Sequence, residues 1–182
     1  MRPDSSIEKL AKLKPVFDKK FGLVTARNSS QITDGACLLL LASASAVRKY
    51  KLPVMGRIVD TQWAALNPAQ MGLGPVHAAT PIMQRHHLKA SDFDCWEINE
   101  AFAAQVLACL AAWNEDEYCK TQFGLSKPLG APSLSQLNQE GGAIAIGHPI
   151  GASGARIVLH LLQSLKHRKG SRGMATICIG GG

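Results

Sequence analysis

Residues 141–154 read Gly-Gly-Ala-Ile-Ala-Ile-Gly-His-Pro-Ile-Gly-Ala-Ser-Gly and contain the most informative pattern of the chain. The apolar run 143–146 is expected to be buried. Pro149 fixes its own φ and disfavours a helical conformation at His148, so a stiff turn is predicted there. Apolar residues then recur at helical spacing, which predicts a helix directly after the turn.

His148 therefore lies just ahead of a predicted helix N-terminus. Unpaired N–H groups gather at such an end, and the helix dipole favours negative charge there. A histidine in this place suits a developing oxyanion or a thiolate. The alternative is a glycine-rich packing turn with a structural histidine, because single motifs match by chance.

The composition indicates a globular chain that fills one domain or one and a half small ones. Of 182 residues, 46% are hydrophobic and 18% are charged, with a formal net charge of +7. No basic helix interleaved with aromatics and no RNA-binding signature occurs. A nucleic-acid partner is therefore not expected, and either a phosphate-bearing small molecule or ordinary surface charge explains the basic surplus.

Cysteine and histidine spacing argues against a structural metal or a disulfide framework. The odd number of cysteines and the lack of C-x-x-C spacing argue against a disulfide framework and against a zinc site. His77, His86 and His87 are not at convincing metal-ligand spacing. No signal peptide or spanning segment is visible. We expect a reducing compartment: cytoplasmic, or mitochondrial or peroxisomal in a eukaryote. The five cysteines are Cys37, Cys95, Cys109, Cys119 and Cys178.

Strands and helices alternate along the chain, which predicts an α/β layered fold with a mostly parallel sheet. Three strand ends carry reactive side chains: Asn99, His148 and Cys178. Asn99 is also a good helix N-cap, which is its structural alternative. A thiol and an imidazole from different elements can form an acid/base pair. The expected strands are 22–26, 52–60, 95–98 and 173–179, the expected helices are 36–50 (buried), 75–87, 99–113 and 151 onward, and 114–139 is expected to be a loop-like insertion.

Three motifs together resemble the thiolases: Asn-Glu-Ala-Phe at 99–102, the 141–156 stretch, and Cys-Ile-Gly-Gly-Gly at 178–182. The likeness spans most of the chain apart from 114–139. It implies the C-terminal half of a five-layer αβαβα fold that lacks the last strand. Residues 1–50 would be a linker and the final strand-helix unit of the first domain, and residues 51–182 the second domain.

The resemblance also implies a catalytic role for four residues. His148 would form the first oxyanion hole and activate the nucleophile, and Asn99 would hold the water that completes this hole. Cys178 would be the general acid/base, and the Gly180 N–H would belong to the second oxyanion hole. Three further residues, Ser30, Met71 and Phe102, would contact the pantetheine part of coenzyme A or line the acyl channel.

The implied activity is thiolytic cleavage or Claisen formation of 3-ketoacyl-CoA, with coenzyme A as substrate, no cofactor and no metal. No cysteine here matches the family's nucleophile, so this chain alone is expected to be inactive. The expected partners are the N-terminal half of a thiolase and, in the full-length protein, further copies of the same protein. Arg27, Gln31 and Thr33 depart from the family pattern near Ser30. Two rivals stay open: a cysteine hydrolase with Cys178 as nucleophile and His148 as base, and a non-catalytic acyl-CoA- or lipid-binding module.

Overall fold

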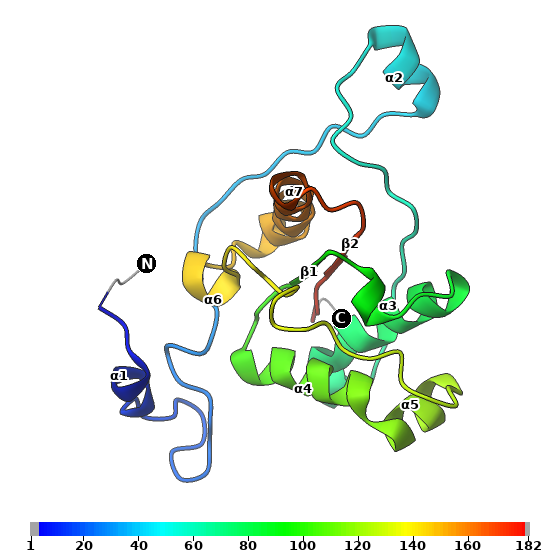
Figure 1. Cartoon of the computed structure of the whole chain (residues 1–182). Helices are drawn as coiled ribbons and strands as arrows, with labels where there is room; N and C mark the ends of the chain where they lie inside the picture. Colours follow the sequence, from blue (N-terminus) through cyan, green and yellow to red (C-terminus); the bar gives the residue numbers. More distant parts are fainter. Residues whose placement is uncertain (1–3, 181–182) are drawn as a thin grey trace.

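The computed structural model describes residues 4–180. Short and long helices surround two strands, and the longest helix follows the glycine-rich turn (Figure 1). In chain order the elements are α1 (Ile7–Ala11), α2 (Ala44–Tyr50), η1 (Pro68–Leu73), α3 (Gly74–Arg85), η2 (Ala90–Asp92), β1 (Cys95–Ile98), α4 (Ala103–Asn114), α5 (Asp116–Phe123), α6 (Ala143–Ile146), α7 (Ile150–Arg168) and β2 (Gly173–Thr176).

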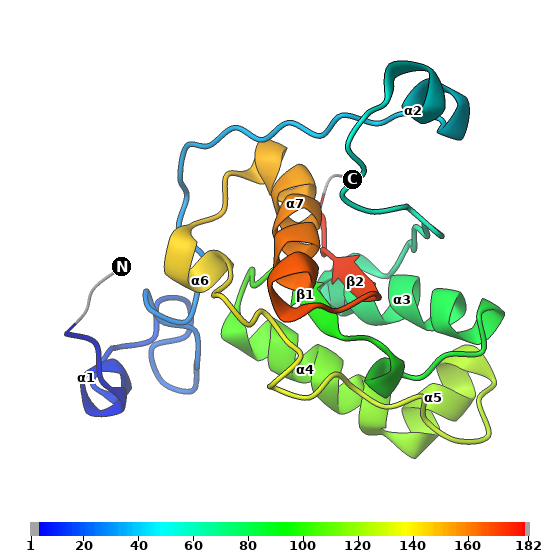
Figure 2. The same cartoon turned by 45° about the horizontal axis from the view of Figure 1, so that its top comes forward.

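The two strands pair in parallel and are covered on both faces, which confirms the predicted layered α/β architecture. Cys95 lies opposite Gly173 and Ile98 opposite Thr176. Helix α7 covers one face of this sheet, and α3 and α4 lie on the other (Figures 1 and 2). The carboxyl ends of both strands therefore reach the same edge, which is where such folds place ligands.

Alternation along β1 divides its side chains between the two faces. Trp96 and Ile98 point into the core beneath the sheet, together with Met174 of β2. The Trp96 ring packs against Trp113 of α4 at 5.4 Å between ring centroids. The indole N–H of Trp113 donates to Thr80 Oγ1 of α3 at 3.0 Å. Large aromatic side chains with satisfied N–H groups thus fix α3 and α4 against the sheet.

Helix α7 forms as predicted, because its apolar residues recur on the side that faces the strands. Ile157 and Leu161 are buried one turn apart, while the helix ends at Lys169 in a left-handed conformation. The turn before the helix requires Gly147, whose φ is +94°. Side-chained residues rarely adopt this conformation.

Several predicted elements were wrong, and the segments concerned are apolar and largely exposed. Residues 22–26 and 52–60 form no strand. The predicted buried helix 36–50 is reduced to α2, which has no buried residue. Leu38 is 85% exposed and Val59 66% exposed. A strand or an oily helix needs a neighbouring surface to satisfy its backbone and cover its side chains.

Other boundaries differ from the prediction for local reasons. Helix α4 begins at residue 103 because Phe102 is extended, so Asn99 is not its N-cap. The run 143–146 is one helical turn in which only Ala143 is buried. Residues 114–139 include α5, which Glu115 caps through its side chain. Strand β2 ends at residue 176 rather than 179.

Candidate active site

Asn99 lies at the carboxyl edge of the sheet, one residue beyond β1. Its backbone N–H donates to the carbonyl of Thr176 at 2.9 Å, which joins the ends of the two strands. The side chain is 2% exposed, and its Oδ1 has no hydrogen-bond partner among the described residues. An unpaired buried acceptor is costly, so this oxygen is suited to receive a hydrogen bond from a water or a ligand.

The imidazole of His148 is held by one partner on each ring nitrogen. Nε2 lies 3.4 Å from Nδ2 of Asn99, and Nδ1 lies 2.6 Å from Oγ of Ser153. The Ser153 hydroxyl donates its hydrogen to the carbonyl of Pro149 at 3.0 Å. Its oxygen therefore accepts from Nδ1–H, and Nε2 keeps a free lone pair that faces the Asn99 amide.

The surroundings of His148 favour the neutral imidazole. Burial lowers its pKa, and the nearby positive charge of Arg156 lowers it further. The guanidinium of Arg156 is itself fixed, since it donates to the carbonyl of Gly147 at 2.8 Å. At neutral pH the ring is thus a free base whose reactive nitrogen is Nε2.

Cys178 follows β2 by two residues and lies beside α3, the helix that covers the face of the sheet opposite α7. Cys178 packs against Gly74 at the N-terminus of α3. A Cβ atom added to Gly74 would lie 3.7 Å from Cα of Cys178. Burial raises the pKa of the Cys178 thiol, which keeps it protonated at neutral pH. Within residues 4–180 no hydrogen bond joins Cys178 to Asn99 or His148, so the structure links two of the three predicted groups directly.

The remaining predicted site residues lie along this edge. The Ser30 N–H donates to the carbonyl of Ala101 at 3.0 Å, which places Ser30 beside Phe102. The next residue in the chain, Gln31, accepts a hydrogen bond from the His148 N–H at 2.9 Å. Met71 and Gly180 are also neighbours, because a Cβ atom added to Gly180 would lie 3.8 Å from Cε of Met71.

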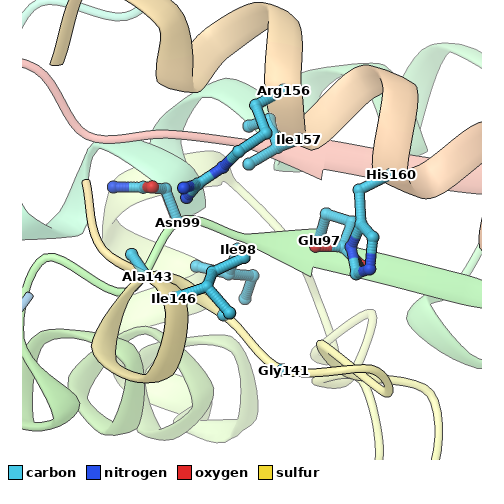
Figure 3. A pocket seen from close by; sticks show the side chains of 10 residues that line it. Glu97, Ile98, Asn99, Gly141, Ala143, Ile146, Arg156, Ile157 and His160 are labelled. Atoms are coloured by element: carbon cyan, nitrogen blue, oxygen red, sulfur yellow. Dashed lines mark ion pairs between the residues drawn. The ribbon is translucent and has the colours of Figure 1, made fainter. Parts of the chain in front are cut away.

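A small cavity of about 50 Å³ continues from Asn99 between β1, α6 and α7. The Arg156 side chain points toward Asn99, and further along the buried carboxylate of Glu97 faces His160 (Figure 3). Nδ1 of His160 lies 3.0 Å from Glu97 Oε1, and burial raises the pKa of Glu97. This pair ties α7 to β1.

Sequence reasoning missed four of these residues: Ser153, Arg156, Glu97 and His160. Ser153 stands among several small residues of the 151–155 segment, so nothing singled it out. A hydroxyl in the first turn of a helix that follows a histidine is a usable signal for the partner of that ring. The Glu97–His160 pair joins elements 63 positions apart, and only the packing of α7 on β1 reveals it.

The site is that of an α/β protein with a neutral imidazole and an amide at the edge of a parallel sheet. Two family profiles match the chain: "Thiolase, C-terminal domain" over residues 52–182 and "Thiolase, N-terminal domain" over residues 1–45. The chain belongs to the thiolase family.

Individual relatives agree with this assignment. The chain is 43% identical over 185 residues to a beta-ketoadipyl-CoA thiolase of Pseudomonas knackmussii, covering 100% of the chain and 41% of that protein. It is 40% identical over 181 residues to the peroxisomal 3-ketoacyl-CoA thiolase of Saccharomyces cerevisiae, covering 100% and 39%. The chain thus spans about two fifths of the length of these curated relatives.

Solved structures give the same result. The acetyl-CoA acetyltransferase of Bacillus anthracis superimposes with a TM-score of 0.83 at 38% identity, covering 100% of the chain and 41% of that structure. Human mitochondrial 3-ketoacyl-CoA thiolase in complex with CoA superimposes with a TM-score of 0.79 at 37% identity, with the same coverage. Among residues 4–180, no helix is both long and apolar enough to cross a membrane.

Proposed function

We propose that the whole protein containing this chain transfers acyl groups between coenzyme A and an enzyme cysteine, and so cleaves or forms 3-ketoacyl-CoA. The observation that carries this proposal is the neutral imidazole of His148, whose Nε2 faces the Asn99 amide at the edge of the sheet. The names of the relatives support the reaction class.

His148 acts first as a base in this proposal. Nε2 accepts the proton of an attacking thiol and then donates it as a hydrogen bond to the oxyanion that forms on the substrate carbonyl. Asn99 holds the water that supplies the second donor, for which its unpaired Oδ1 is available. A single such donor is worth about 3–4 kcal/mol of transition-state stabilisation.

Cys178 is the proton donor and acceptor. In cleavage it protonates the carbanion of the departing acyl-CoA, and in condensation it removes the same proton. A buried thiol with a raised pKa suits a donor better than a nucleophile. The raised thiol pKa also weighs against the rival hydrolase, in which Cys178 would have to be the nucleophile.

Binding of coenzyme A falls to the segment that pairs with the Asn-Glu-Ala-Phe motif. Ser30 and Phe102 are adjacent through the bridge between residues 29 and 102, and Met71 lies beside Gly180. We assign these residues to the pantetheine and acyl channel. A homo-oligomer is also proposed, because a peroxisomal yeast relative is described as dimeric. Yeast peroxisomal and human mitochondrial relatives suggest similar compartments if the source is eukaryotic.

The test is coenzyme A-dependent cleavage of acetoacetyl-CoA and of a longer 3-ketoacyl-CoA by the full-length protein. We expect turnover by the wild type, a loss of about 10²- to 10³-fold in His148→Ala, and a loss of similar size in Cys178→Ala. Circular dichroism should remain that of the wild type. Residues 1–182 alone should not cleave either substrate.

The same assay separates the rivals. Hydrolysis of an acyl-CoA without added coenzyme A, abolished by alkylation of Cys178, would favour the hydrolase. Binding of coenzyme A in a calorimeter without any turnover would favour the non-catalytic module. Unfolding of both alanine variants would return His148 and Cys178 to a structural role.

A further inference from the structure

The side chain of Asn138 extends the β1 ladder where the main chain can no longer do so. Residues 136–138 run along the free edge of β1: Trp96 N–H donates to Gln136 O at 2.8 Å, and Asn138 N–H donates to Trp96 O at 2.9 Å. The chain then turns away, because Asn138 adopts a φ of +42° and its carbonyl accepts from Gly141 N–H at 2.9 Å.

Beyond this turn the side-chain amide of Asn138 bonds to the backbone of β1, where a neighbouring main chain would otherwise do so. Its Oδ1 accepts from the N–H of Ile98 at 2.9 Å, and its Nδ2 donates to the carbonyl of the same residue at 2.9 Å. The second Nδ2 hydrogen goes to Glu100 Oε1 at 2.8 Å. Asparagine combines a donor and an acceptor in one short side chain and tolerates the left-handed conformation, so it suits both demands.

These bonds hold the residues on either side of Asn99. Ile98 is clamped at both backbone groups, and the Glu100 carboxylate is fixed between Asn138 and the N–H of Ile144 at 3.1 Å. The Asn99 N–H is tied to Thr176. The direction of the Asn99 side chain therefore depends on the Asn138 amide.

We propose that Asn138 is a positioning residue, which holds residues 98–100 so that the Asn99 amide meets Nε2 of His148. It does not touch substrate; it acts through Asn99. This inference rests on the function proposed above, in which the Asn99–His148 pair binds the acyl oxygen.

Two variants of the full-length protein remove the clamp in different ways. Asn138→Gly keeps the left-handed backbone and loses only the amide, while Asn138→Asp keeps the acceptor for Ile98 N–H and places a carboxylate against Glu100. Asn114→Ala is the matched control: that amide also joins two backbone groups, Leu110 O and Ala131 N–H, both at 3.1 Å, away from the site.

For both Asn138 variants we expect kcat to fall about 10- to 100-fold, the size of effect that a small misplacement of a catalytic group produces. KM for the acyl-CoA should stay within about twofold, as expected when only the transition state is affected. Asn114→Ala should lower the melting temperature and leave kcat unchanged. Wild-type kcat in either Asn138 variant, or loss of the folded state in both by circular dichroism, would overturn the positioning role.

A second readout does not depend on turnover. In protein labelled at the histidine Cε1 atoms, the His148 resonance is assigned by its absence in His148→Asn and titrated with pH. The titration midpoint of His148 should rise in Asn138→Gly, because Nε2 loses its contact with the Asn99 amide, which favours the neutral ring. The midpoint should be unchanged in Asn114→Ala. An unchanged midpoint in Asn138→Gly contradicts the positioning role, whereas absent turnover in the wild type contradicts only the proposed function.

Discussion

Replacement of Ser153 by alanine is the sharpest perturbation of the His148 ring. The serine lies in the first turn of α7, is fully buried, and bridges Nδ1 of His148 at 2.6 Å to the carbonyl of Pro149 at 3.0 Å. Ser153→Ala removes both bonds and leaves Nδ1–H without its partner. The tautomer that presents a free lone pair at Nε2 then loses its support.

The magnitude follows from that unpaired donor. A buried polar group left without a partner costs about 1–3 kcal/mol. If the whole cost falls on the transition state, kcat drops about 5- to 150-fold, at about 1.4 kcal/mol for each factor of ten. If the ring instead rotates to find another partner, Nε2 leaves the Asn99 amide and the loss of kcat is at least as large.

The assay is 3-ketoacyl-CoA thiolysis by the full-length protein, with the free energy of unfolding measured beside it. Ser164→Ala is the control, because Ser164 lies on the same helix, is 1% exposed, and has an Oγ without a partner among the described residues. It should retain full kcat and lose no stability. Equal kcat in the two variants would refute the argument that Ser153 sets the His148 tautomer.

Three further substitutions test the electrostatics and the backbone. Arg156→Met removes a charge that lowers the His148 pKa, so the acid limb of the kcat/KM profile should move to higher pH; a shift to lower pH would contradict this. His160→Ala leaves the buried Glu97 carboxylate unpaired and raises its pKa further, so urea unfolding should show a loss of about 3 kcal/mol at neutral pH. Because the pKa of Glu97 is higher in the folded than in the unfolded protein, protonation of this carboxylate favours the folded state at low pH. The loss of unfolding free energy in His160→Ala should therefore shrink as the pH falls through the raised pKa. A loss that stays constant with pH would contradict this prediction. Gly147→Ala forces a side chain to a φ of +94° and should lower the melting temperature by the equivalent of about 1–3 kcal/mol, with unchanged stability as the contrary result.

The sequence predicted those parts of the fold that are specified locally. Helix α7 and the turn at His148 follow from a periodic apolar pattern and from Pro149, both of which act within a few residues. Strand β1 is a short buried run, and its end at Asn99 could be placed for the same reason. In contrast, segments 22–26 and 52–60 have strand-like composition but form no ladder, because pairing is a property of the neighbour as well as of the segment.

Within the site, residue types were easier to predict than their contacts. Asn99 and His148 were expected to meet, and they lie 3.4 Å apart. Cys178 was expected to join them; it lies beside the N-terminus of α3, and among residues 4–180 no hydrogen bond links it to either side chain. Asn138 fell in a segment expected to be a variable loop, and its role depends on a left-handed backbone that no periodic pattern announces.

The most direct test is a crystal structure of the full-length protein with a bound acyl-CoA. We predict that the acyl carbonyl oxygen lies about 3 Å from Nε2 of His148, with a water held by Asn99 as its second donor. A carbonyl oxygen bound elsewhere, with His148 facing only protein atoms, would contradict the account.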